Sequence, residues 1–183
     1  MVVFERLQEE YEKEKKVYIA TDDVALALLA AKPNTPIQNR VVIMKEMFLA
    51  YKELLDKDVD KQHVEVVDPE FFAHDYGAFS YKVAETISLL VSNGYIERTG
   101  RKGNEQFSLT KMGKKVFKLT MASEKGKYLK GIFNKLKTKR KGWDISSRQG
   151  LINLTYNIYP EYKENSKLKN RYQATPWAAL FKE

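Results

Sequence analysis

The chain has 183 residues but no cysteine and only two histidines. The lack of cysteine excludes disulfides, thiolate metal sites and thiol nucleophiles. Four good zinc ligands cannot be assembled around His63 and His74, and no set of base, nucleophile and orienting residue is recognisable. The phosphate-binding pattern GxxxxGK[ST] is also missing. We therefore expect no enzyme activity, no cofactor and no metal.

Long apolar runs are absent as well. No stretch approaches the roughly 20 residues that cross a bilayer. Residues 1–16 are charged and lack the apolar core of a signal peptide. We expect a cytoplasmic protein without a membrane partner, and the lack of cysteine fits a reducing compartment.

Charge is divided unevenly along the chain. Residues 1–110 carry 14 Lys/Arg against 19 Asp/Glu, whereas residues 111–183 carry 18 against 5. The net charge of +8 therefore comes from a strongly basic C-terminal part. Such a part is typical of proteins that meet a polyanion or an acidic protein. A solvated, lysine-rich surface without a binding role is the open alternative.

The most informative stretch is residues 79–113. Ser80 is a good N-cap for a helix whose apolar residues recur at helical spacing, and Asn93-Gly94 is a typical helix end. Two strands are predicted next, at 95–98 and 106–109, with a glycine-rich basic turn between them. Thr110 can cap the helix that follows. This order predicts a winged helix-turn-helix in which the hairpin is the wing.

The rest of the chain is predicted to be helical, so the expected fold class is mainly α (α+β), with additional N- and C-terminal helices around the winged-helix core. Expected helices are a buried one capped by Thr21, the longest one over 37–55, a basic one over 125–141 ended by Gly142, and one over 144–159. The aromatic turn 71–79 should seat the helix after Ser80, with Tyr76 and Phe79 in the core. The expected division is an N-terminal helical extension (1–19), a winged-helix-like domain (20–122) and a basic C-terminal helical region packed on it (123–183).

Several short segments resemble known families. They are Asn39-Arg40 with Leu49, Tyr-Gly-Ala-Phe-Ser at 76–80, Leu-Leu-Val-Ser-Asn-Gly-Tyr-Ile at 89–96, Phe-Ser-Leu-Thr-Lys-Met-Gly at 107–113, and Tyr-Asn-Ile-Tyr-Pro-Glu-Tyr at 156–162 followed by Ser166. Together these segments, over about residues 24–166, resemble the Panacea-type domains and the YwgA-like proteins. Panacea domains usually carry proline where this chain has Ala78. The resemblance implies a winged-helix-like fold and, for Panacea members, an antitoxin role exerted by binding a partner protein. It carries over no active-site residue.

Two functions follow from these patterns. The first is binding of double-stranded DNA, with the helix after Ser80 in the major groove, the wing on the backbone and lysines on phosphates. The candidate contacts are Ser80, Tyr81, Lys82, Arg98, Arg101, Lys102, Asn104, Lys111, Lys114, Lys115 and Lys118. The exposed face of the first helix lacks the Arg, Asn and Gln that usually read bases.

The second function is a protein-interaction module, antitoxin-like or adaptor-like, that binds an acidic or other protein partner. The aromatic residues of 71–81 and the apolar segment from Trp177 to Phe181 are its candidate anchors. Core packing is the competing interpretation of these aromatic residues. The N-terminal helix, with Phe4, Leu7, Tyr11 and Tyr18 on one rough stripe, is a candidate homodimer contact. A solvent-facing helix with i,i+4 ion pairs is the open alternative.

Overall fold

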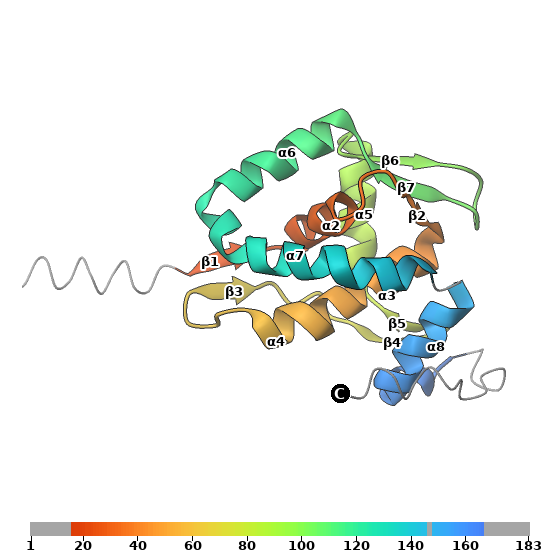
Figure 1. The fold of residues 1–183 in the computed structure, drawn as a ribbon. Helices are drawn as coiled ribbons and strands as arrows, with labels where there is room; N and C mark the ends of the chain where they lie inside the picture. Colours follow the sequence, from red (N-terminus) through yellow and green to blue (C-terminus); the bar gives the residue numbers. More distant parts are fainter. Residues whose placement is uncertain (1–15, 146–147, 167–183) are drawn as a thin grey trace, which may run out of the picture.

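The computed structural model describes residues 16–145 and 148–166. This part of the chain is mainly helical with three small sheets, which confirms the coarse fold class (Figure 1). Its helices are α2 (Thr21–Ala30), α3 (Asn39–Ala50), η1 (Tyr51–Leu55), α4 (Asp56–Asp58), α5 (Tyr81–Ser92), α6 (Lys111–Ala122), α7 (Glu124–Ile145), α8 (Arg148–Ile158) and η2 (Pro160–Lys163). Its strands are β1 (Val17–Ile19), β2 (Ile37–Gln38), β3 (Val64–Val66), β4 (Phe72–His74), β5 (Gly77–Phe79), β6 (Ile96–Thr99) and β7 (Gln106–Leu109).

Helix α2 forms the centre of the core. The residues from Val24 to Leu29 are at most 3% exposed, because they are apolar all round. The predicted cap is wrong by one position. Ala20 is the N-cap, and the Asp23 carboxylate accepts a hydrogen bond from the backbone N–H of Ala20 at 2.9 Å. Thr21 is the first helical residue, and its hydroxyl contacts the Tyr51 hydroxyl at 3.3 Å.

The largest sheet has three antiparallel strands in the order β2-β7-β6. Strands β6 and β7 are the hairpin predicted from the sequence, with Arg98 opposite Phe107. Strand β2 adds to the outer side of β7, where Ile37 pairs with Phe107. The predicted helix over 37–55 is therefore wrong at its start.

Helix α3 begins at Asn39 because this residue has a positive φ of 55° and accepts two backbone bonds. Its Oδ1 atom accepts from the N–H groups of Val41 at 3.0 Å and Val42 at 3.1 Å. Asparagine adopts the left-handed conformation more readily than most residues, so it stops the strand and starts the helix. The helical path then widens to a π-helix at η1 and ends with α4.

The segment between α3 and α5 folds into two further small sheets. Strand β3 pairs in parallel with β1, and β4 and β5 form an antiparallel hairpin. Since residues 17–19 are a strand, the predicted helical extension over 1–19 is wrong at its end. Tyr18, a member of the predicted helical stripe, lies in β1 and is exposed, so the stripe is wrong at this residue. The other members, Phe4, Leu7 and Tyr11, lie outside the described residues, as do Trp177 and Phe181.

Helix α7 is the longest helix of the described part and lies against α2, α3 and α6 (Figure 1). It does not end at Gly142 as predicted but continues to Ile145. Arg140 on α7 is fully buried, and its guanidinium donates to the backbone oxygens of Leu28 at 3.2 Å and Thr35 at 2.8 Å. Arg140 Nε also lies 3.4 Å from a carboxylate oxygen of the fully buried Glu46 on α3. Arg140 therefore joins α7 to the end of α2 and to α3.

The segment from α8 to η2 packs on α3 through aromatic rings, one from Tyr159 between the two helices and one from Tyr162 in η2. The ring of Phe48 on α3 meets Tyr159 and Tyr162 edge to face, with centroids 5.1 and 4.7 Å apart. Helix α8 starts at Arg148, so the helix predicted over 144–159 begins later than expected. Within the described ranges, no helix combines the length and hydropathy that a membrane crossing needs.

Candidate nucleic-acid interface

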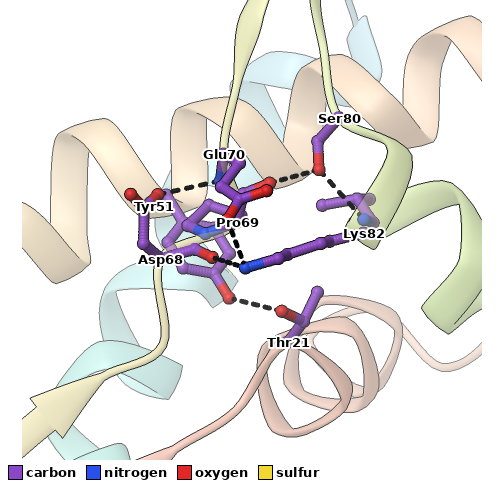
Figure 2. Close-up of polar contacts among 8 residues, drawn as sticks. Thr21, Tyr51, Asp68, Pro69, Glu70, Ser80 and Lys82 are labelled. Carbon is purple, nitrogen blue, oxygen red and sulfur yellow. Dashed lines mark hydrogen bonds and ion pairs between the residues drawn. The ribbon is translucent and has the colours of Figure 1, made fainter.

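Helix α5 begins as its sequence predicts. The Ser80 hydroxyl accepts a hydrogen bond from the backbone N–H of Val83 at 3.0 Å, which confirms Ser80 as the N-cap. The same hydroxyl donates to the Pro69 carbonyl oxygen (Figure 2). Ser80 is fully buried, so both of its bonds serve the helix start and it presents no atom to a nucleic acid.

Lys82, in the first turn of α5, is held by the segment before the β4–β5 hairpin. Its ammonium lies 2.6 Å from a Glu70 carboxylate oxygen and 3.4 Å from the Asp68 backbone oxygen (Figure 2). Glu70 has a positive φ of 55°, and Asp68 accepts a bond from its backbone N–H at 2.8 Å. The cation that the sequence offers for base or phosphate contact at this helix start is therefore already paired.

Aromatic side chains surround the start of α5. Tyr81 is 68% exposed and stacks on Phe72 with ring centroids 5.5 Å apart, and Phe79 meets both rings edge to face. Val83, Ile87 and Leu90 face the core as expected. The expectation that Tyr76 is also in the core is wrong, because its side chain is 42% exposed. Tyr76 stands in the turn between β4 and β5, where the Arg148 guanidinium of α8 lies 5.8 Å from the centroid of its ring.

The β6–β7 turn carries exposed cations on glycine-shaped backbone. Gly100 and Gly103 have φ of 83° and 92°, which other residues rarely adopt. Arg101, Lys102 and Asn104 lie between or beside these glycines and are exposed. The geometry of the turn thus directs polar and basic side chains into solvent.

Glu105 fixes this hairpin to α3. Its carboxylate accepts from the Gly103 N–H at 2.8 Å and pairs with the Arg40 guanidinium at 2.9 Å, and its backbone oxygen accepts from the Asn39 N–H at 2.6 Å. Burial favours the neutral acid, but hydrogen bonds from the backbone N–H groups of Glu105 itself and Gly103, together with Arg40, outweigh it and hold the pKa of the Glu105 carboxyl below its ordinary value. The Glu105 carboxylate is therefore ionised, and the Arg40 guanidinium compensates its negative charge within the fold.

Helix α6 carries the remaining predicted contacts. Thr110 caps it, accepting from the Gly113 N–H at 3.0 Å. The lysines of its outward face, all exposed, are Lys111, Lys114, Lys115 and Lys118. In Figure 1, α6 starts at the base of the β6–β7 hairpin, and both elements lie along the top edge of the molecule in this view.

The structure therefore separates the predicted contacts into two groups. One group lies at the start of α5, where Ser80 is buried and Lys82 is paired with Glu70. The other group consists of exposed cations with no ion pair among the described residues, and we call it the basic edge. Its members are Arg98, Arg101, Lys102, Lys111, Lys114, Lys115 and Lys118. Asn104 adjoins the basic edge at the hairpin turn.

Sequence reasoning missed the buried ionisable residues Lys45, Glu46 and Arg140. Lys45 and Glu46 stand in the middle of an apolar helix face, where their neighbours Met44 and Met47 predict burial. Burial of a charge normally requires a partner. A lysine and a glutamate within an otherwise apolar helix face were therefore the signal in the sequence that could have indicated buried charges.

Loss of the Ser80 cap should measurably loosen α5. We expect Ser80→Ala to lower the free energy of unfolding by about 1 kcal/mol, because the first turn loses its acceptor. Urea denaturation measures the change. Ser88→Ala, at an exposed position in the same helix, is the matched control and should stay within about 0.5 kcal/mol of wild type. An equal loss in both variants would contradict the capping role.

These observations define a mainly helical α+β protein with a basic edge and no assembled metal site among the described residues. Comparison with models of known protein families finds no match, and comparison with curated proteins finds none either.

Proposed function

We propose that the chain is a winged helix-turn-helix protein that binds double-stranded DNA through its phosphates, without catalysis. The order helix, short strand, helix, helix, hairpin in α2, β2, α3, α5 and β6–β7 supports the winged-helix assignment, as does the strand order β2-β7-β6. The structure differs from a usual helix-turn-helix in the long segment between α3 and α5. A helix-turn-helix usually has a turn of only three or four residues at this place.

The basic edge is the observation that carries the DNA proposal. Between residues 98 and 123 the chain has seven Lys/Arg and a single acidic residue, Glu105. Glu105 is 4% exposed and pairs with Arg40, so its charge does not compensate the basic edge. Uncompensated, exposed cations that follow a hairpin and the helix after it suit the closely spaced phosphates of a duplex.

We do not expect helix α5 to recognise DNA bases. Lys82 would have to leave Glu70 before it could contact DNA, and the other exposed residues of the helix include no Arg, Asn or Gln. Contacts to phosphates position a protein without carrying sequence information. We therefore expect affinity for random duplex with little sequence preference.

The test is the salt dependence of duplex binding, measured by fluorescence anisotropy with a labelled random DNA. If about four cations engage phosphates, the slope of log K against log salt should be near −4. Reversing the charge of Arg101, Lys102, Lys114 and Lys118 together should bring the slope close to zero.

The matched control reverses four exposed lysines away from the basic edge, Lys16, Lys61, Lys139 and Lys141. Both variants have the same net charge, so a difference between them reports position and not overall charge. Equal losses of affinity in the two variants would refute the basic edge as the interface, and no binding at low salt would refute DNA binding.

A protein-interaction module is the second candidate, and the exposed aromatic residues at the start of α5 favour it. Tyr81 and Phe72 are 68% and 37% exposed and stack on each other, and such rings often anchor interfaces. An interaction of this kind should survive high salt and be lost in Tyr81→Ala. Duplex binding through the basic edge should be unaffected by the same substitution.

A further inference from the structure

A cavity of about 290 Å³ lies between α3, the β4–β5 hairpin, α5 and the β6–β7 hairpin. Its walls are mainly apolar, and they include Val41, Met44, Val83, Ile87 and Phe107. The volume is close to the lower end, roughly 300 Å³, of small-molecule sites. The cavity therefore suits a small ligand with an apolar body.

The charged groups that line the cavity are all basic. Lys45 and Arg40 come from α3 and Arg98 from β6, and none of the described lining residues carries a carboxylate. Arg40 is paired with Glu105 outside the lining, whereas Arg98 is exposed and has no ion pair within the described residues. The cavity thus has excess positive charge on two of its sides.

Lys45 is the buried member of this group. It is 2% exposed, and its ammonium donates to the Ala78 backbone oxygen of β5 at 2.6 Å. An ammonium has three donors, and this is the one hydrogen bond of Lys45 among the described residues. Because buried charges are normally paired with an opposite charge, the position of Lys45 has room for an acceptor that carries one.

Burial lowers the pKa of Lys45 to about 7. Protonation of the free protein at this residue is therefore incomplete at neutral pH. An anion beside the amine would favour the ammonium and raise this pKa again.

We propose that this cavity binds a small carboxylate with an apolar body, such as the anion of a medium-chain fatty acid. The carboxylate lies on the Lys45 ammonium, and the apolar chain lies between α3 and α5 against Met44, Val83 and Ile87. This site is separate from the proposed DNA interface, with which it shares only Arg98. A failure of either proposal leaves the other in place.

Calorimetry with three probes of the same chain length tests the ligand class. Octanoate should bind the full chain at least about tenfold more tightly than octan-1-ol, because a charged hydrogen bond is worth more than a neutral one. Octylamine should bind more weakly than octanoate, because its ammonium disfavours the protonated form of Lys45 whereas a carboxylate favours it. Equal affinity for octanoate and octan-1-ol would overturn the proposal.

Lys45→Met tests the role of the amine while keeping an unbranched apolar side chain. This variant should lose the preference for octanoate over octan-1-ol. The matched control is Lys52→Met on η1, whose side chain pairs with Asp56 outside the cavity, and it should keep the preference. An unchanged preference in Lys45→Met would also overturn the proposal.

Proton uptake gives a second measurement on the wild-type protein, which stands even if Lys45→Met does not fold. At pH 8 the amine is mostly neutral in the free protein, so binding of octanoate should take up a proton, and affinity should fall as the pH rises further. Binding enthalpies in buffers of different ionisation enthalpy measure the uptake.

The other titratable groups facing the cavity are His74, Tyr76, Arg40 and Arg98. Uptake should persist in His74→Asn, and octanoate binding without uptake would exclude Lys45 as the contact.

Discussion

Replacing Arg140 with alanine should lower the free energy of unfolding by about 3–5 kcal/mol. The guanidinium is fully buried beside the equally buried Glu46 and donates to backbone oxygens at the end of α2. Its removal leaves a carboxylate in the core without its nearby cation and removes a donor from these carbonyl groups. The expected loss is a large part of the stability of an ordinary domain.

Urea or thermal denaturation of the full chain measures this effect. Lys141→Ala changes the next residue of α7, which is exposed, and should cost less than about 0.5 kcal/mol. The double variant Glu46→Leu with Arg140→Leu removes both charges and should be less destabilised than Arg140→Ala. A loss in Arg140→Ala as small as that in Lys141→Ala would show that the buried pair does not support the fold.

Gly113→Ala should destabilise the protein near the upper end of the about 1–3 kcal/mol that overpacking costs. A Cβ atom at this position in α6 would lie 2.0 Å from the backbone oxygen of Tyr95, just before β6. Backbone atoms cannot move aside as a flexible side chain can, so the start of α6 would have to move away from the sheet.

The same substitution at Gly131 provides the control. Gly131 is exposed within α7, and a Cβ atom there meets nothing within 4 Å. Alanine is the better helix former by about 0.5–1 kcal/mol, so Gly131→Ala should stabilise the protein. The two alanine variants are thus expected to differ in sign, and thermal unfolding of both distinguishes close packing at Gly113 from a general effect of glycine in helices.

Much of the region from Ser80 to Thr110 could be predicted because its signals are local. A serine cap, a glycine after a helix and a basic glycine turn act through bonds to near neighbours in sequence. Gly94, for example, has a φ of 73° at the end of α5, as its position predicts. The same local signals located the strands β6 and β7.

Other features depend on residues far apart in sequence, and the sequence did not reveal them. Arg140 stands in a basic segment where its neighbours are exposed, and its burial follows from the place where α2 ends. Gly142 is a plausible helix end by itself, but packing of α7 on α2 and α3 continues the helix past it. The pairing of β1 with β3 likewise joins segments more than forty residues apart.

The candidate interface shows the same division. The cations of the basic edge could be identified from composition, since the segment from Arg98 to Lys118 has little acidic charge. The pairing of Lys82 could not, because Glu70 reaches it from a turn with a positive φ. The cavity at Lys45 arises only where α3, α5 and two hairpins meet.

The position of Arg140 also bears on how the chain folds during its synthesis. Arg140 follows Leu28, whose carbonyl oxygen it binds, by 112 residues. Glu46, the buried carboxylate beside Arg140, is synthesised earlier as well. At a synthesis rate of about 5–20 residues per second, Glu46 leaves the peptidyl-transferase centre roughly 5–20 s before Arg140. During that interval we expect Glu46 to stay hydrated and the core around α2 to remain open. The nascent chain before α7 would then expose apolar surface that chaperones bind, and final closure of the core would wait until α7 has emerged.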